Sequence, residues 1–165
     1  MNSSKTGTNK ALKIRLAERD DIETLFEIRT SVTENYQSRE EIAELGITPE
    51  SVAEMLATDC CAWIVEIEEQ PIGFSIASAT EKTIFGLFVR PDFEGRGVGR
   101  KLMQTTENWF WPQGLDEIWL LTGNNPSWRA YGFYEHLNWI PVGVESDGDF
   151  AGEMKFIKKR PDTLS

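Results

Sequence analysis

The stretch RPDFEGRGVGRKLM, residues 90–103, places three glycines at alternate positions between an apolar run and a helical pattern. The preceding TIFGLFV, residues 83–89, is apolar throughout, which predicts a strand buried on both faces. After the glycines, apolar residues recur at helical spacing until Pro112 and Gly114 end the helix. A glycine-rich turn from a strand into a helix offers free backbone N–H groups and the positive end of a helix dipole, which together bind phosphate. The stretch therefore predicts a phosphate-binding loop, although Gly-x-Gly also occurs in tight turns that bind nothing.

Two common phosphate-binding motifs fit this stretch poorly. A Walker loop ends in Gly-Lys-Ser/Thr, whereas Gly99 is followed here by Arg100 and Lys101. A dinucleotide fingerprint that starts at Gly95 needs its third glycine where Arg100 stands. Such a fingerprint also begins a βαβ unit, whereas this loop follows a predicted antiparallel meander. A nicotinamide-binding protein is therefore the least favoured interpretation of this stretch.

The chain upstream of the loop predicts a strand followed by three helices. Alternating apolar residues indicate a half-buried strand over residues 12–17. Asp20, with Glu23 three residues later, predicts the start of a helix whose apolar stripe continues to Tyr36. A short helix and a second one follow, marked by the following signals: the capping box of Ser38 and Glu41, the stop at Gly46, the cap Thr48 with Pro49 at the first helical position, and an end near Thr58.

The middle and end of the chain predict a sheet. Three runs separated by short turns indicate an antiparallel meander, over residues 60–68, 70–79 and 83–89. After the helix that follows the glycine loop, the patterns predict a buried strand over residues 117–122, a helix over 127–137, and closing strands over 139–144 and 153–159.

Composition indicates one domain with no role in nucleic-acid or membrane binding. With 165 residues, 40% of them hydrophobic, the chain is long enough for one well-buried core, and we expect a single domain over residues 11–158 between a disordered tail, 1–10, and a C-terminal tail, 159–165. The net charge of −10 argues against nucleic-acid binding. No apolar run has the length of a signal peptide core or a membrane span, so we expect a cytoplasmic protein. The adjacent Cys60 and Cys61 point to opposite faces of a strand and do not pair, which fits a reducing compartment.

The glycine loop resembles the acyl-coenzyme A binding loop of the GNAT superfamily of N-acetyltransferases, whose pattern is Gln/Arg-x-x-Gly-x-Gly/Ala. Glu94 takes the Gln/Arg place, and Gly97 and Gly99 take the glycine places. The order of the predicted elements is also similar, over residues 12–157, and the segment around the first helices resembles one bacterial subgroup. The resemblance implies a mixed α/β (α+β) fold: a mostly antiparallel central sheet whose fourth and fifth strands splay apart, flanked by helices.

The segment SWRAYGFYEHLNW, residues 127–139, carries a second resemblance, to the family pattern Asn-x-x-Ala-x-x-x-Tyr-x-x-x-Gly-Phe. Ala130 and Tyr134 coincide with it. Ser127 stands where Asn is usual, so the cofactor contact expected from that Asn falls to Ser127 or to Asn125.

These resemblances imply acetyl-coenzyme A as co-substrate and a set of residues that hold it. The backbone at the end of the fourth strand would bind the pantetheine arm, through Leu87, Phe88 and Val89. The loop would hold the pyrophosphate, through Glu94, Gly95, Arg96, Gly97, Val98, Gly99 and Arg100. Close backbone approach or a bulge at Gly86 would suit this site, and a plain packing glycine is the alternative. The only histidine, His136, makes no metal site with the single acid beside it, so we expect no metal.

Four side chains are candidates for chemistry or acceptor binding. Tyr134 stands where the family carries the acid that protonates the departing thiolate, the alternative being a core tyrosine. An attacking amine must lose a proton, and Glu81 before the fourth strand or Glu34 near the end of the first helix is a candidate base or acceptor contact; either is otherwise a solvated surface residue. Arg29 falls in the apolar stripe, where it either binds an acceptor carboxylate or lies with its stem on the core and its head in water.

The sequence thus predicts an N-acetyltransferase that moves an acetyl group from acetyl-coenzyme A to a primary amine, of a small molecule or a peptide, by direct attack. The alternative is a non-catalytic module that binds acyl-coenzyme A as a sensor or interaction unit. The sequence does not identify the acceptor, and it leaves a homodimer open.

Overall fold

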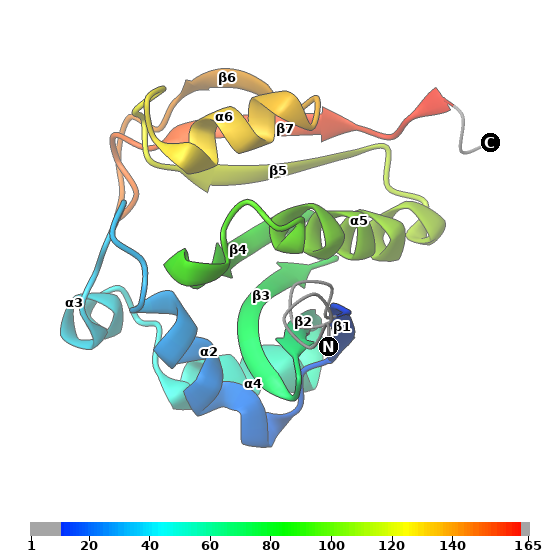
Figure 1. The fold of residues 1–165 in the computed structure, drawn as a ribbon. Coiled ribbons are helices and arrows are strands. Elements are labelled where there is room, and N and C mark those ends of the chain that lie inside the picture. The colour runs from blue at the N-terminus through cyan, green and yellow to red at the C-terminus, as the bar shows by residue number, and fades with distance from the viewer. Residues whose placement is uncertain (1–10, 163–165) are drawn as a thin grey trace.

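A seven-stranded sheet runs through the structure, a computed structural model that describes residues 11–162 (Figure 1). The predicted tail over residues 1–10 and the last three residues lie outside the described part. The strands lie in the order β1-β2-β3-β4-β5-β7-β6, and only β4 and β5 pair in parallel. They span β1 Lys13–Leu16, β2 Cys60–Ile67, β3 Gln70–Ser78, β4 Thr83–Val89, β5 Glu117–Thr122, β6 Ile140–Val144 and β7 Met154–Lys159. The predicted antiparallel meander and mixed α/β fold are confirmed, while Lys159, predicted to begin the C-terminal tail, is the last residue of β7.

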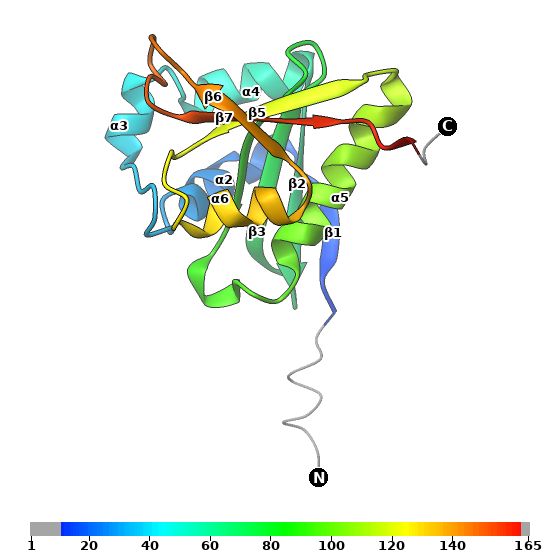
Figure 2. The ribbon, with the colours of Figure 1, turned by 90° about the horizontal axis from the view of Figure 1, so that it is seen from above.

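Helices cover both faces of this sheet, as Figures 1 and 2 show from two directions. One core lies between β2, β3 and the first helices, and includes Phe26, Ile28 and Ile64. The other lies beneath α5 and α6 and includes Leu102 and Phe156. The helices are α2 Ile22–Arg29, α3 Arg39–Glu44, α4 Pro49–Thr58, α5 Val98–Phe110 and α6 Arg129–His136, with 3-10 turns η1 Arg19–Asp21, η2 Pro91–Phe93 and η3 Trp111–Gln113. No helix of residues 11–162 is both long enough and apolar enough to cross a membrane.

The starts of α3 and α4 follow the predicted capping chemistry. The Glu41 amide donates to Ser38 Oγ at 3.1 Å, and the Ser38 amide donates to the Glu41 carboxylate at 2.9 Å. Thr48 Oγ1 accepts from the Ser51 amide in the same way at 3.1 Å. These bonds satisfy amides that have no acceptor inside their helices.

The first helix differs from its prediction at both ends. Asp21, rather than Asp20, accepts the Glu18 amide at 2.7 Å, where the η1 turn leads into α2. The helix ends at Arg29 instead of continuing to Tyr36, because the Thr30 and Ser31 hydroxyls donate to carbonyls of the last turn, at 2.9 and 2.6 Å. The seven residues after Arg29 therefore form a loop.

The strand β4 is the second correction, since it is not covered on both faces along its length. Thr83 and Ile84 are buried and pair with β5, but no further pairing joins these two strands. The β3–β4 register shifts between Ile76 and Ala77, which leaves Phe85 as a bulged residue beside Gly86, with 51% of its side chain exposed. Of the alternatives predicted for Gly86, the register supports a bulge, with Phe85 as the unpaired residue. The apolar end of β4 faces an opening instead of a second neighbouring strand.

Candidate active site

A cleft of about 780 Å³ opens where β4 and β5 separate. Its walls come from residues 84–89 of β4, from the end of β5, from the segment that enters α5, and from α6. Residues 32–35, in the loop after α2, close its remaining side. The volume lies within the range of about 300–1,000 Å³ that is common for small-molecule sites.

The glycine loop presents its backbone to this cleft. Gly95 and Gly97 have φ of +78° and +84°, values that side chains disfavour, and Gly97 is the N-cap of the 13-residue α5. The first bond of the helix runs from the Lys101 amide to the Gly97 carbonyl at 3.0 Å. The amides of residues 98–100 therefore have no acceptor within the helix. Unpaired amides at the positive end of a helix dipole are an arrangement that favours an anion.

A small residue at position 99 allows the Phe133 ring of α6 to lie against the start of α5. A Cβ atom on Gly99 would come within 3.1 Å of Phe133 Cζ, so the ring would have to shift by a few tenths of an ångström. The loop side chains lie to the side of the amides: the Arg96 guanidinium lies 5.1 Å from the centre of the Phe93 ring, and Arg96 is not among the cleft-lining residues.

Two carboxylates hold the start of α6 against the cleft. The Arg129 amide, in the first turn of α6, donates to Glu34 Oε1 at 2.8 Å. The Arg129 side chain forms an ion pair with Glu94 at 3.3 Å. Both acids line the cleft, and the first bond joins residues 95 positions apart in the chain. Glu34 and Glu94 therefore connect α6 to the loop after α2 and to the glycine loop.

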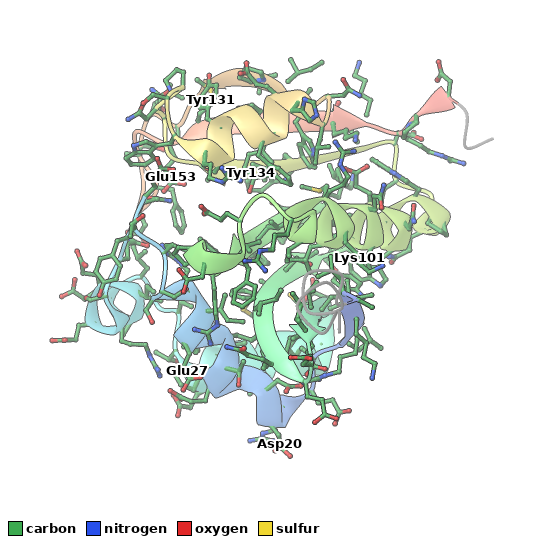
Figure 3. The ribbon with its side chains drawn as sticks, in the orientation of Figure 1. Asp20, Glu27, Lys101, Tyr131, Tyr134 and Glu153 are labelled. Carbon is green, nitrogen blue, oxygen red and sulfur yellow. The ribbon has the colours of Figure 1, made fainter. Side chains whose placement is uncertain are left out.

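Tyr134 lines the same cleft from α6 (Figure 3). Its ring packs against Phe133, Trp139 and Phe156, and 6% of the residue is exposed. Burial raises the pKa of the Tyr134 hydroxyl, because the phenolate loses its hydration. Within residues 11–162 the hydroxyl has no hydrogen-bond partner, so it is a protonated donor available to the cleft.

Five of the residues predicted for the site are not among those that line the cleft: Arg29, Glu81, Arg96, Asn125 and Ser127. Glu81 is exposed in the turn before the paired end of β4, where its carbonyl accepts the Trp119 indole N–H at 3.0 Å. Asn125 accepts the Ser127 amide and hydroxyl at 3.0 and 2.7 Å, so the two residues shape the turn before α6.

Arg29 lies behind the cleft wall, at the end of α2. Its guanidinium lies 4.4 Å from the centre of the Phe88 ring, and Phe88 lines the cleft. Nη2 donates to the Gln37 side chain at 2.8 Å and to the Asn35 carbonyl at 3.3 Å. Burial lowers the pKa of Arg29, and the charge of Glu153 opposes that shift. Glu153 carries no local signal in the sequence, because the charge that it interacts with lies more than a hundred positions away.

The sequence matches the model of the Acetyltransferase (GNAT) family over residues 21–139. The chain belongs to the GNAT acetyltransferase family. The matched residues include the glycine loop, the cleft-lining part of β4 and Tyr134. No curated protein matches the sequence.

Solved structures of GNAT proteins share the fold at low sequence identity. The PaiA N-acetyltransferase of Thermoplasma acidophilum, in complex with coenzyme A, has 18% identity and a TM-score of 0.73 over 91% of this chain and 99% of its own. The ribosomal-protein-S18-alanine N-acetyltransferase of Escherichia coli has 16% identity and a TM-score of 0.68 over 94% and 99%. A chimera of the spermidine N-acetyltransferase SpeG from Vibrio cholerae and hSSAT has 14% identity and a TM-score of 0.66 over 90% and 95%.

The predictions of a GNAT fold and of an acyltransferase are thereby confirmed. The separation of β4 and β5, which the resemblance implied, is the feature that creates the cleft.

Proposed function

We propose that this GNAT protein transfers an acetyl group from acetyl-coenzyme A to a primary amine by direct attack. The observation that carries the proposal is that one cleft combines three features: unpaired amides at the start of α5, an unpaired edge of β4, and a protonated tyrosine. A phosphate-bearing thioester substrate needs an anion site, a strip of backbone for its amide-containing arm, and a proton for its leaving group.

The binding residues follow from this arrangement. The backbone of the loop, from Gly95 to Arg100, would hold the pyrophosphate, because the amides at the start of α5 have no acceptor within the helix and the glycines admit close approach. The backbone of Leu87, Phe88 and Val89 would bind the pantetheine arm, since β3 occupies one edge of this part of β4 and β5 leaves the other free. The PaiA enzyme, which has the same fold, was solved with coenzyme A, and this supports the assignment.

Tyr134 is the proposed general acid. Bound acetyl-coenzyme A supplies an activated thioester, whose carbonyl carbon is the target of the amine. The Tyr134 hydroxyl donates its proton to the sulfur as the carbon–sulfur bond breaks, so that a thiol leaves instead of a thiolate. The nitrogen loses one proton as the amide forms, and this proton restores the Tyr134 hydroxyl. A tyrosine hydroxyl is protonated at neutral pH, which is the form that an acid needs, and burial raises the pKa of Tyr134 further.

Neither carboxylate suggested as a base is free in the cleft. Glu81 lies outside the lining, and Glu34 accepts the Arg129 amide. An amine attacks only in its unprotonated form, so the rate rises with pH towards the pKa of the acceptor amine.

The test is thiol release by the purified protein with acetyl-coenzyme A and a panel of polyamines, amino acids, aminoglycosides and peptides. We expect release to depend on an acceptor and to match the acetylated product seen by mass spectrometry. Stabilisation by acetyl-coenzyme A with no turnover of any acceptor would instead support a non-catalytic binding module. Failure of acetyl-coenzyme A to stabilise the protein would overturn the cofactor assignment.

A further inference from the structure

Arg29 is a half-buried cation whose bonding is incomplete. Its Nη2 is used by Gln37 and Asn35, while Nη1 is buried and has no hydrogen-bond partner in the described structure. No carboxylate of residues 11–162 forms an ion pair with it. An unpaired N–H of a buried charged group is costly, and such groups in native proteins usually have a partner.

Glu153 is a half-buried anion that lies close enough to Arg29 for the two charges to influence each other. It directly precedes β7, whose Met154 pairs with Thr122, the last residue of β5. Figures 1 and 2 show the β6–β7 loop beside the segment that follows α2, and Figure 3 shows Glu153 at the end of that loop. No residue of the described chain donates a hydrogen bond to its carboxylate. Burial raises the pKa of Glu153, and the Arg29 charge opposes the shift.

The two charges thus lie near each other without contact. Arg29 lies against Phe88 of β4, and Glu153 lies beyond the end of β5, so they approach the splayed strands from opposite sides. Each loses hydration without gaining an ion pair, which favours neither charge by itself. A ligand that carries both a carboxylate and an ammonium group would supply an anion to Arg29 and a cation to Glu153.

We propose that the acceptor is an amino acid, whose carboxylate binds Arg29 and whose ammonium group binds Glu153 and gives up a proton to that carboxylate before the nitrogen attacks. This inference rests on the proposed function and names its substrate class. The carboxylate would bond to Nη1, once the side chains that cover this atom move aside, and the charge-assisted bond offsets that cost. The net charge of −10 would favour a polycation, but the Arg29 cation behind the cleft wall disfavours one.

The experiment uses thiol release to compare each amino acid with the corresponding amine, which has the same side chain but lacks the α-carboxylate. We expect kcat/KM to be about 10- to 100-fold higher for the amino acid, as is typical of a hydrogen bond to a charged group. Arg29→Met should abolish this preference by lowering only the value for the amino acid. Arg29→Lys, which keeps the charge, should retain part of it, and Glu153→Gln should weaken both acceptors.

Arg39→Met is the matched control. The Arg39 guanidinium also lies 4.4 Å from an aromatic ring, that of Phe26, but it is exposed and pairs with Glu23. This control should leave the preference for the amino acid unchanged. The affinity for acetyl-coenzyme A should be unchanged in every variant.

Three results would overturn the inference. One is a higher kcat/KM for the amines than for the amino acids, or for polyamines than for either. Another is an unchanged preference in Arg29→Met. The third applies if Arg29→Met does not fold. It is a Glu153→Gln variant that keeps the preference for the amino acid and the full kcat/KM for both acceptors. Transfer without a carboxylate preference contradicts this inference alone, whereas failure to transfer to any amine contradicts the proposed function as well.

Discussion

The two ends of β4 have similar apolar sequences, but one end pairs with β5 and the other lines the cleft. At its beginning, Thr83 and Ile84 are 1% and 4% exposed and pair with Trp119 and Leu120 of β5. At its end, residues 87–89 pair only with β3 and line the cleft. The difference arises from the neighbouring strand and not from the residues of β4.

This contrast separates stability from chemistry within one strand. Burial and pairing at the closed end stabilise the sheet, whereas unpaired backbone at the open end is available to a ligand. Substitutions near the open end should therefore change kinetics, and substitutions at the closed end should change the free energy of unfolding.

The largest effect is expected at Tyr134. Tyr134→Phe keeps the ring and removes the acid, so turnover should fall by about 10²- to 10⁴-fold with little change in stability, as measured by thiol release. Tyr131→Phe is the control, since Tyr131 is also buried on α6 but does not line the cleft. Equal turnover in the two variants would show that the cleft tyrosine is a packing residue.

The next effect concerns the glycine loop. At about 100 times its Kd, acetyl-coenzyme A should stabilise the protein by about 2.7 kcal/mol, and Gly97→Asp should remove this gain because a carboxylate repels the pyrophosphate. Gly46→Asp imposes the same backbone strain, at φ of +84° in both places, but lies far from the cleft. Thermal unfolding with and without ligand measures both, and loss of the ligand shift in Gly46→Asp as well would contradict the assignment.

The closed end should respond in stability alone. Thr83 Oγ1 donates to the Trp119 carbonyl at 2.8 Å, joining β4 to β5 where both are buried. Thr83→Val should lower the free energy of unfolding by about 1 kcal/mol in urea titrations. A selective loss of kcat, without loss of stability, would mean that the two ends of β4 are not separable.

The smallest expected effect is that of pH on kcat, because Tyr134 should stay protonated over the range tested. Tyr134 acts in its protonated form, which is lost as pH rises through its pKa, and burial moves that pKa upward from its ordinary value of about 10. For an acceptor that is already unprotonated, kcat should stay level from about pH 8 to about pH 10. A fall centred near the ordinary value would indicate a solvated tyrosine.

Local patterns were sufficient for much of the fold and for the loop. Capping residues such as Ser38 and Thr48, and the glycines before α5, act within one helical turn, so adjacent letters reveal them. The end of α2 was missed although Thr30 and Ser31 carried a signal, because their hydroxyls compete with the helix. The exposure of Phe85 left no signal, since an apolar residue can face a strand or a cleft.

The acceptor side of the site depends on contacts between distant residues. Glu34 meets Arg129, and Arg29 influences Glu153, only after the sheet has brought α2, α6 and β7 together. Arg29 could be singled out because a charge in an apolar stripe is unusual. Glu153 could not, because an acid before a strand resembles any solvated loop residue.

The loop that enters α5 presents main-chain amides to the cleft, and this affects how the sequence can change. Substitution cannot delete an amide unless the new residue is proline, so the side chains at positions 96 and 100 can vary while these amides persist. Only the glycines, which set the path of the backbone, are constrained. An evolutionary lineage can then replace most of its residues and keep one cofactor, in keeping with neighbours that share 14% to 18% identity and the same fold.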